Sequence, residues 1–327
     1  MTPPLKVVVT DYTFASLETE AQILKPLGCD FVGRQCKSEQ ELIDLVADAD
    51  VVVTQFAPLT PPVINAMSKA RVIIRYGIGV DNVNLPAATE KGIPVCNVPD
   101  YCIDEVADHT LSMMLSLTRQ IPQISNRVRA GKWRTALDLS KMRVLKALTV
   151  GIVGFGRIGR EVVQRLRPFK CAIMAFDPVV PAGDMAAMGV KASDLPALFQ
   201  ASDIISLHCP STPQTKNLIN RDTLAQMKRG VIILNLSRGN VINQDDLIQG
   251  LQEGKVGGTA LDVTVPEPIN GDSPLLEMEN VIITNHVASC SALAVHRLRK
   301  QVAETVIVAL RGEKLPNVVN PQALKKQ

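Results

Sequence analysis

The sequence lacks the features that mark membrane proteins, disulfide-stabilised secreted proteins and nucleic-acid-binding proteins. No window of its 327 residues has the roughly 18 uninterrupted apolar residues of a membrane span, and the apolar run at the N-terminus is too short for a signal peptide. The seven cysteines are odd in number and contain no Cys-x-x-Cys pair, which favours reduced thiols. The net charge is only +3, which offers no extended basic surface for nucleic acid. We therefore expect a cytoplasmic protein that binds a small molecule and no metal.

The sequence also has no low-complexity segment and no repeat of about 20–50 residues. Its length exceeds the roughly 100–200 residues of one domain, so we expect two domains, each with its own core. In the first third of the chain, short β-branched runs alternate with helical patterns. The predicted strands are 7–10, 50–54, 72–75 and 94–97, with helices near 16–27 and 61–68. Strands separated by helices predict a parallel sheet with right-handed crossovers.

A second alternation of the same kind predicts a doubly wound α/β domain. Its predicted strands are 149–153, 173–176, 203–208, 231–236, 258–262 and 281–285. Before it lies one long helical pattern, from Asp104 to about residue 131, with Asp104 placed to cap it and Pro122 to kink it. Apolar residues surround this helix, which indicates a domain junction or a subunit interface. A last helix over 292–311 precedes a tail that we expect to return to the first domain.

The stretch VGFGRIG lies between a predicted strand and a helical pattern and contains Gly154, Gly156 and Gly159. In this spacing the first glycine permits a tight turn, the second lets the backbone approach a pyrophosphate, and the third lets helix and strand pack closely. The next strand ends at Asp177, 18 residues later, near the roughly 20-residue offset of a ribose-binding acid. A carboxylate accepts hydrogen bonds from both ribose hydroxyls of NAD and repels the 2′-phosphate of NADP, and Pro178 adds no positive charge. The predicted cofactor is therefore NAD(H).

A second glycine pair, Gly77 and Gly79 in RYGIGVDN, follows a predicted strand of the first domain. It has no third glycine, which argues against a dinucleotide role. Two interpretations stay open: a tight turn, or backbone N–H groups turned toward an anion such as a carboxylate.

Four histidines are candidates for a general acid. His208 and His286 each follow a strand of the second domain, at the sheet edge where ligands gather in such folds. His208 could line a cofactor site without transferring a proton, whereas His109 and His296 lie within helical patterns and are interpreted as packing or surface residues.

Two further side chains follow strands at the same predicted edge as His286. Arg238 comes after one strand and Glu267 after the next. Each alone could be merely solvated. Together they supply a carboxylate to hold a histidine, a histidine to carry a proton, and a guanidinium able to grip a carboxylate through two parallel hydrogen bonds.

With these residues in place, the chain resembles the D-2-hydroxyacid dehydrogenase family over nearly its whole length. The similar stretches, in order, are RYGIGVDNV, GIPVCNVPDY, DEVADHTLSMML, VGIVGFGRIGR, LHCPSTPQTKNLI, ILNLSRGNVIN, GGTALDVTVPEP and NVIITNHVAS. Within the family, QFAPLT and NVPDYCIDEVADH are most similar to the C-terminal-binding-protein-like branch.

The resemblance implies a Rossmann NAD domain (104–292) inserted in a flavodoxin-like substrate domain (1–103 and 293–327), a cleft that closes on binding, and a homodimer using the long helix. It implies that Arg238 binds the substrate carboxylate and carbonyl, that His286 is the acid/base, and that Glu267 hydrogen-bonds His286 and favours its protonated form. Backbone N–H groups of Ile78 and Gly79 would bind the carboxylate. The implied cofactor contacts are Gly154, Gly156, Arg157, Ile158, Gly159, Asp177, Pro178, Cys209, Pro210, Thr215, Leu236, Ser237, Asp262 and Ala288.

Two features of the sequence bear on the substrate. Many relatives have Thr-Pro-His where this chain has Asn285 before the histidine. In phosphoglycerate dehydrogenases the loop after the third strand carries arginines that meet the phosphate, whereas residues 54–58 here read TQFAP. We therefore expect a small 2-keto acid with a neutral side chain, such as glyoxylate, hydroxypyruvate or pyruvate, with Phe56 against its tail. An NAD(H)-sensing corepressor-like scaffold and phosphoglycerate dehydrogenase itself are the alternatives.

Overall fold

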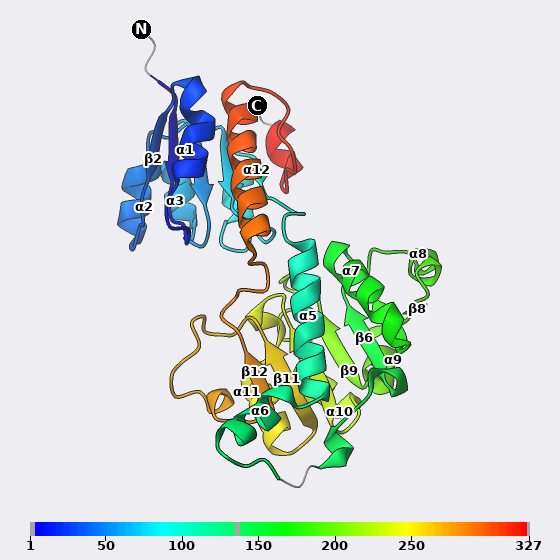
Figure 1. Ribbon diagram of the computed structural model, residues 1–327. Coiled ribbons are helices and arrows are strands. Elements are labelled where there is room, and N and C mark those ends of the chain that lie inside the picture. Colours follow the sequence, from blue (N-terminus) through cyan, green and yellow to red (C-terminus); the bar gives the residue numbers. More distant parts are fainter. Residues whose placement is uncertain (1–3, 135–137, 326–327) are drawn as a thin grey trace. The chain divides into compact units, whose positions relative to one another are not determined.

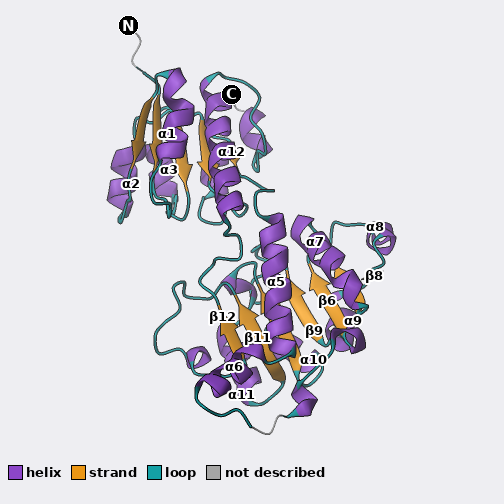
Figure 2. Cartoon of the chain, viewed as in Figure 1, coloured by secondary structure: helices purple, strands orange, loops and turns teal. Residues whose placement is uncertain are grey.

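The chain divides into two compact units in a computed structural model that describes residues 4–134 and 138–325 (Figures 1 and 2). Unit 1 comprises Met1–Tyr101 and Ser291–Gln327, and unit 2 comprises Cys102–Cys290. Each unit is an α/β structure on a parallel sheet, so the predicted fold class is confirmed. Within the described residues, none of the helices combines the length and the apolar character needed to span a bilayer.

Unit 1 has a five-stranded parallel sheet in the order β2-β1-β3-β4-β5, the flavodoxin-like arrangement. Its central strands are almost wholly buried because helices cover both faces, and such strands read as continuous apolar runs in the sequence. The strands are β1 (Lys6–Val9), β2 (Asp30–Gly33), β3 (Val51–Thr54), β4 (Val72–Arg75) and β5 (Val95–Cys96).

Helices α1 and α12 pack together on one face of this sheet, and α2, α3 and α4 adjoin one another on the other. The side chains of Ser38, Asn84 and Ser291 cap α2, α4 and α12, each accepting a backbone N–H of the first turn. The helices are α1 (Glu18–Leu24), α2 (Glu39–Val46), α3 (Pro61–Ala66), α4 (Leu85–Glu90) and α12 (Ala292–Leu310).

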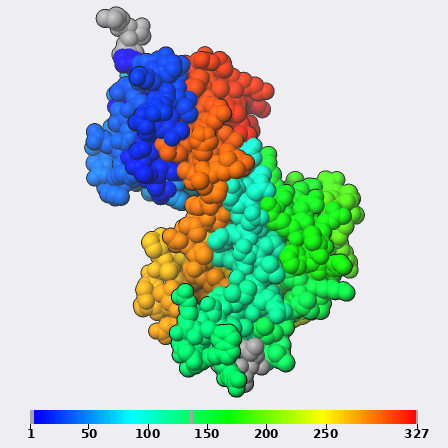
Figure 3. All heavy atoms as spheres, in the orientation of Figure 1, coloured from blue at the N-terminus to red at the C-terminus, as the bar shows by residue number. Residues whose placement is uncertain are grey.

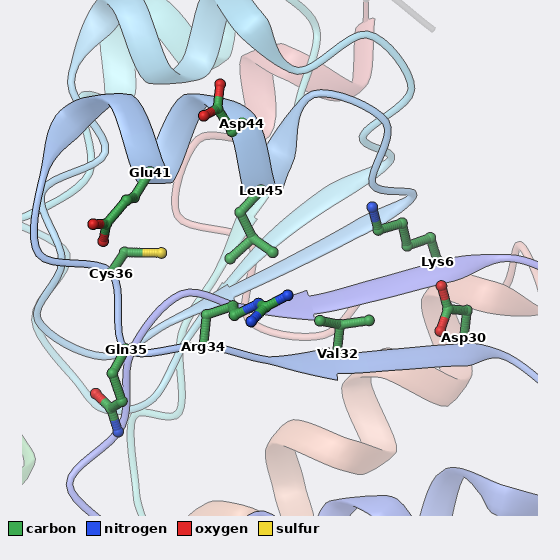
Figure 4. A pocket seen from close by; sticks show the side chains of 9 residues that line it. All are labelled: Lys6, Asp30, Val32, Arg34, Gln35, Cys36, Glu41, Asp44 and Leu45. Carbon is green, nitrogen blue, oxygen red and sulfur yellow. The ribbon is translucent and has the colours of Figure 1, made fainter.

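Strand β2 and helix α2 are absent from the sequence prediction. The four residues of β2 form the edge of the sheet and are only partly buried, so the strand has no continuous apolar run to reveal it. Beside it, β2 and α2 border a surface hollow of about 650 Å³ that contains both basic and acidic side chains (Figure 4). Its lining is Lys6, Asp30, Val32, Arg34, Gln35, Cys36, Glu41, Asp44 and Leu45.

Unit 2 has a seven-stranded parallel sheet in the order β12-β11-β10-β9-β6-β7-β8. If β6 is counted as the first strand of this unit, the order is that of the Rossmann fold, with β12 as one added strand. The strands are β6 (Thr149–Val153), β7 (Ala172–Phe176), β8 (Lys191–Ala192), β9 (Ile204–Leu207), β10 (Val231–Asn235), β11 (Val256–Leu261) and β12 (Val281–Ile283).

Helices α5 and α7 pack together beside this sheet, with α5 against β10 and β11, while α9, α10 and α11 adjoin one another. The helices are α5 (Ile103–Thr118), α6 (Ile121–Arg129), α7 (Arg157–Leu166), α8 (Ala182–Ala187), α9 (Leu195–Ala201), α10 (Arg221–Gln226) and α11 (Gln244–Gln252).

The sequence predicts one long helix that Asp104 caps and Pro122 kinks, whereas the structure has two helices, and Asp104 does not cap the first. The helix breaks into α5 and α6 at Gln120, whose φ of 51° is left-handed, and Pro122 lies in the first turn of the second helix. Proline suits that position because the first turn needs no N–H donor. Asp104 lies inside the first turn of α5 and accepts a hydrogen bond from Arg165 of α7 at 2.8 Å.

An ion pair is buried in unit 1 between helices α1 and α12. The Arg299 guanidinium donates to both carboxylate oxygens of Glu20, at 2.6–3.2 Å, and the Tyr76 hydroxyl donates to the same carboxylate at 3.0 Å. Glu20 is 1% exposed. The pair joins the N-terminal and C-terminal parts of unit 1 and also holds Tyr76, the residue before Gly77.

Replacing Arg299 with methionine should lower the free energy of unfolding by about 3–5 kcal/mol, because the Glu20 carboxylate would then be buried without its partner. The matched control is Lys300→Met, which removes a solvent-exposed pair with Glu304 worth at most about 1 kcal/mol. Urea unfolding of the two variants measures the difference. Equal losses would show that the buried pair contributes no more than a surface pair.

Candidate active site

The predicted site residues of unit 2 lie in spatial order along one edge of its sheet. His286 follows β12, Glu267 follows β11 and Arg238 follows β10, and these three strands are neighbours. Next along the edge come the end of β9, then the glycine loop after β6 and Asp177 after β7. All the strands are parallel, so their carboxyl ends share this edge, where ligands of doubly wound sheets bind.

His286 and Glu267 form a direct hydrogen bond. His286 Nδ1 lies 2.6 Å from Glu267 Oε1, and because a carboxylate only accepts, Nδ1 is the donor. The two side chains are partly exposed, at 25% and 43%. A histidine held through Nδ1 in this way can exchange a proton with a ligand only through Nε2.

Arg238 lies in a turn that buried polar groups hold in place. The Asn235 side chain, which is fully buried at the end of β10, donates to the Arg238 carbonyl at 2.9 Å and accepts from the N–H and hydroxyl of Ser237. Gly239 follows, and a Cβ there would lie 2.1 Å from the Thr264 carbonyl oxygen. Only glycine therefore lets the turns after β10 and β11 approach this closely.

Asp262 organises the loop that carries His286. Its carboxylate, 2% exposed, accepts from the Thr284 hydroxyl and from the backbone N–H groups of Val287 and Ala288, at 2.6–3.0 Å. Its carbonyl accepts from the His286 N–H at 2.8 Å.

The glycine loop has the geometry expected for a pyrophosphate. Gly154 has φ of 96°, and a Cβ there would lie 2.7 Å from the backbone of His208 and Cys209. A Cβ on Gly159 would lie 2.2 Å from the Gly154 carbonyl, whereas one on Gly156 would meet nothing within 4 Å.

The helix that follows this loop begins at Arg157 and Ile158, and no side chain caps its N-terminus. Backbone N–H donors and the positive end of the helix dipole face the open space beside Gly156. These residues therefore fit the phosphates of a dinucleotide.

Asp177 already binds backbone groups. Its carboxylate accepts from the N–H groups of Phe155, Val179 and Val180 at 2.8–3.1 Å, which ties the end of β7 to the glycine loop. A carboxylate offers about four acceptor positions, so capacity for a ribose hydroxyl is left. Pro178 beside it is exposed.

The end of β9 contributes neutral groups. Burial lowers the pKa of His208 to about 4, so its imidazole is uncharged near neutral pH, consistent with a lining role without proton transfer. Burial likewise raises the pKa of the Cys209 thiol to about 11. The Thr215 hydroxyl donates to the Pro210 carbonyl at 2.6 Å and so closes the turn that follows.

In unit 1, the Gly77–Gly79 turn follows β4. Gly77 has φ of 139°, and the carbonyls of Gly77 and Ile78 accept from the Val98 N–H and the Asn97 side chain. Across the part of the chain that the structure describes, no acceptor pairs with the N–H groups of Ile78 and Gly79. Two adjacent donors of this kind suit a carboxylate.

Phe56 and Arg75 lie together at the carboxyl edge of the sheet of unit 1. Phe56 is 45% exposed, and the Arg75 guanidinium carbon lies 5.6 Å from its ring centroid. Arg75 is 7% exposed and donates to the Gln55 carbonyl at 3.2 Å. The sequence analysis considered only residues 54–58 and so missed this positive charge, because Arg75 belongs to the next strand, β4.

Asn235, Thr284 and His109 are also missing from the predicted set. Asn235 and Thr284 form their side-chain hydrogen bonds at the carboxyl edge of the sheet. His109 Nε2 on α5 lies 3.2 Å from the Thr284 hydroxyl. A polar residue at the end of an apolar strand is the one available signal for the first two, and nothing in the sequence pairs His109 with Thr284.

Comparison with known proteins gives one family match and many relatives. Residues 111–288 match the family model described as D-isomer specific 2-hydroxyacid dehydrogenase, NAD binding domain. The chain is 38% identical over 320 residues, 97% of its length, to D-3-phosphoglycerate dehydrogenase of Methanocaldococcus jannaschii, of which it spans 59%. It is 36% identical over 291 residues to glyoxylate reductase of Korarchaeum cryptofilum, covering 88% of each chain. It thus spans little more than half of the phosphoglycerate dehydrogenase relatives it matches.

Solved structures are similar over almost the whole chain. D-lactate dehydrogenase from Aquifex aeolicus, complexed with NAD and lactic acid, superimposes with a TM-score of 0.85 at 28% identity, covering 98% of each chain. A glyoxylate reductase from Paecilomyes thermophila superimposes with a TM-score of 0.88 at 25% identity, covering 98% of this chain and 100% of the other. The predicted family and the predicted NAD-binding domain are thereby confirmed.

Proposed function

Because the chain belongs to the D-isomer-specific 2-hydroxyacid dehydrogenase family, we propose that it interconverts a small 2-keto acid and its D-2-hydroxy acid with NAD(H). The observation that carries the proposal is the 2.6 Å hydrogen bond between His286 and Glu267, with Arg238 on the neighbouring strand end. This set can bind an anionic carbonyl compound and move one proton to or from its oxygen.

Each of the three residues has a role in the proposed reduction. The Arg238 guanidinium binds the substrate carboxylate and polarises the carbonyl. The Ile78 and Gly79 N–H groups are proposed as carboxylate donors on the family resemblance alone. Reduced nicotinamide, when bound, supplies the hydride to C2 of the substrate. His286 gives the Nε2 proton to the carbonyl oxygen, and Glu267 orients the imidazole through Nδ1 and stabilises the charged form during the proton transfer.

We propose a neutral substrate side chain packed against Phe56. The ring is 45% exposed and lies over Arg75, so it presents an apolar surface and covers one face of the guanidinium. Glyoxylate, hydroxypyruvate and pyruvate satisfy this requirement.

Phosphoglycerate dehydrogenase activity is a second candidate, and one observation favours it. The loop of residues 54–58 contains no basic residue, but the Arg75 guanidinium of the neighbouring strand lies beside it. If Phe56 moves aside, the guanidinium could meet a phosphate. Replacing Phe56 with alanine should then improve the use of phosphohydroxypyruvate relative to glyoxylate.

We propose that NADH is preferred over NADPH, since the Asp177 carboxylate would repel a 2′-phosphate and Pro178 offers no cation. We also propose that Arg157, Ile158, Cys209, Pro210, Thr215, Leu236, Ser237, Asp262 and Ala288 line the cofactor, as the family resemblance implies.

Two glycines of the loop should respond differently to alanine. Gly156→Ala should keep the thermal stability of the native protein but weaken NADH binding by roughly 10-fold, since its Cβ would occupy only the space proposed for the pyrophosphate. Gly159→Ala should lower the melting temperature, because its Cβ would collide with the Gly154 carbonyl at 2.2 Å. Thermal melting and NADH fluorescence titration separate the two effects. Unchanged NADH affinity in Gly156→Ala would place the pyrophosphate elsewhere.

We propose a homodimer formed through the segment after α5. Half of the residues of α5 are buried, whereas the following segment, which lies at the surface in Figure 3, contains exposed apolar side chains. They are Ile121, Val128, Trp133, Leu139 and Val144, and Trp133 is 80% exposed. Sedimentation should give a dimer that Trp133→Glu weakens, and an unchanged assembly would contradict this interface.

The cytoplasmic location stays a prediction, which rests on the odd number of cysteines and the lack of a Cys-x-x-Cys pair. The C-terminal-binding-protein-like branch also stays a prediction, which the comparisons do not support, since the relatives described above are phosphoglycerate dehydrogenase, glyoxylate reductase and D-lactate dehydrogenase.

The decisive experiment measures NADH oxidation by the purified protein with glyoxylate, hydroxypyruvate, pyruvate and phosphohydroxypyruvate, with NADPH run in parallel. Rapid NADH-dependent turnover of one neutral 2-keto acid is the expected result. Preferred turnover of phosphohydroxypyruvate would instead support the second candidate. No turnover despite tight NADH binding would favour the NAD(H)-sensing scaffold.

A further inference from the structure

A chain of three side chains leads from helix α5 to the loop of His286. His109 Nε2 lies 3.2 Å from the Thr284 hydroxyl, which donates to Asp262 Oδ1 at 2.6 Å. The Asp262 carboxylate also accepts from the N–H groups of Val287 and Ala288, so it binds the loop on both sides of His286.

The direction of each hydrogen bond in this chain is fixed. A hydroxyl has one proton, and Thr284 gives it to a carboxylate that can only accept. His109 Nε2 must then be a donor, so the chain runs from His109 to Thr284 to Asp262 without an alternative arrangement.

The loop that these hydrogen bonds hold has a strained backbone at His286. His286 has φ of 57°, a left-handed conformation that costs about 1–2 kcal/mol for a residue with a side chain. Such a conformation persists only where the surroundings enforce it. Here the enforcing contacts are the Asp262 carboxylate and the Asp262 carbonyl, which accepts the His286 N–H.

We propose that Asp262, Thr284 and His109 are positioning residues that hold His286 in the left-handed conformation in which its Nδ1–H meets Glu267. The proposal rests on the proposed function of His286 as proton donor and adds three residues that act through it. It extends the role of Asp262 beyond the cofactor contact that the family resemblance implies.

The test uses the 327-residue protein with Thr284→Val, which keeps the shape of the side chain but removes the donor, and Thr284→Ser, which keeps the donor. Thr284→Val should lower kcat by about 10–100-fold with little change in the KM for NADH, because a small misplacement of a catalytic group has a cost of this size. Thr284→Ser should restore most of the lost turnover.

A readout independent of turnover is the tautomer of His286, followed by ¹⁵N NMR of the four labelled histidines, with the His286 signal assigned through His286→Asn. The native protein and Thr284→Ser should show the Nδ1–H form, and Thr284→Val should lose it while the melting temperature changes little. His109→Leu and His109→Gln form a second pair, in which only glutamine keeps a donor.

Retention of both the Nδ1–H form and full turnover in Thr284→Val and His109→Leu would overturn the proposal. If the native protein turned over no 2-keto acid but the tautomer changed as expected, the proposed function would fail while the positioning role stood.

Discussion

His286→Asn should lower kcat by about 10²–10⁴-fold, the range that general acid–base groups contribute, and should leave the fold intact. The imidazole is held by Glu267 at 2.6 Å at the edge where the cofactor loop also ends, and asparagine carries no group that could transfer the proton. Asparagine suits the test because it tolerates a φ of 57° better than most residues, so loss of activity would not reflect new backbone strain. Steady-state kinetics on the preferred 2-keto acid measures the effect.

His296→Asn is the matched control, because His296 is exposed on α12 and should keep native turnover. Glu267→Gln should reduce kcat less than His286→Asn, since an amide still fixes the ring but cannot stabilise its charge. Full activity of His286→Asn would remove His286 from the mechanism.

Arg238→Gln should lower kcat/KM by about 10²–10³-fold, as does loss of a donor to a developing oxyanion. Arg238 is expected to act on the carboxylate and the carbonyl together, so substrate capture and turnover should both fall. Arg238→Lys should recover only part of the loss, because an ammonium is a point charge without the planar fork of a guanidinium.

NADH affinity separates this outcome from damage to the cofactor site and should stay native in both Arg238 variants. The matched control is Arg221→Gln, at a solvent-exposed arginine of α10 whose side chain is 74% accessible. Near-native kcat/KM in Arg238→Gln would assign carboxylate binding to other groups, with Ile78 and Gly79 the next to test.

The elements that could be predicted from the sequence are the strands that are buried on both faces of a sheet. Strands such as β3 and β10 are apolar at nearly every position, because helices cover both faces of a parallel sheet. The glycine loop and the strand-end residues Arg238 and His286 could be placed for the same reason, since the run of each strand shows where its carboxyl end lies.

What the sequence could not predict depends on contacts between distant segments. The edge strand β2 has no apolar run, and the break at Gln120 needs a left-handed residue that no pattern marks. The link from His109 to Thr284 joins residues 175 positions apart, and Arg75 reaches Phe56 from another strand. Such pairs can be identified only from the three-dimensional structure, because the fold brings together residues that are far apart in the sequence.

The discontinuity of unit 1 has a consequence for biosynthesis. Residues 102–290 form a continuous unit that can complete its fold while the ribosome is still making the rest, whereas the earlier residues 4–101 must wait. Until α12 and the tail emerge, Glu20 has no Arg299, and the Val95 N–H and Ile93 carbonyl have no Asn320 side chain. The part of unit 1 that is translated before unit 2 is therefore the last to close, and until then its sheet lacks the contacts of the C-terminal part.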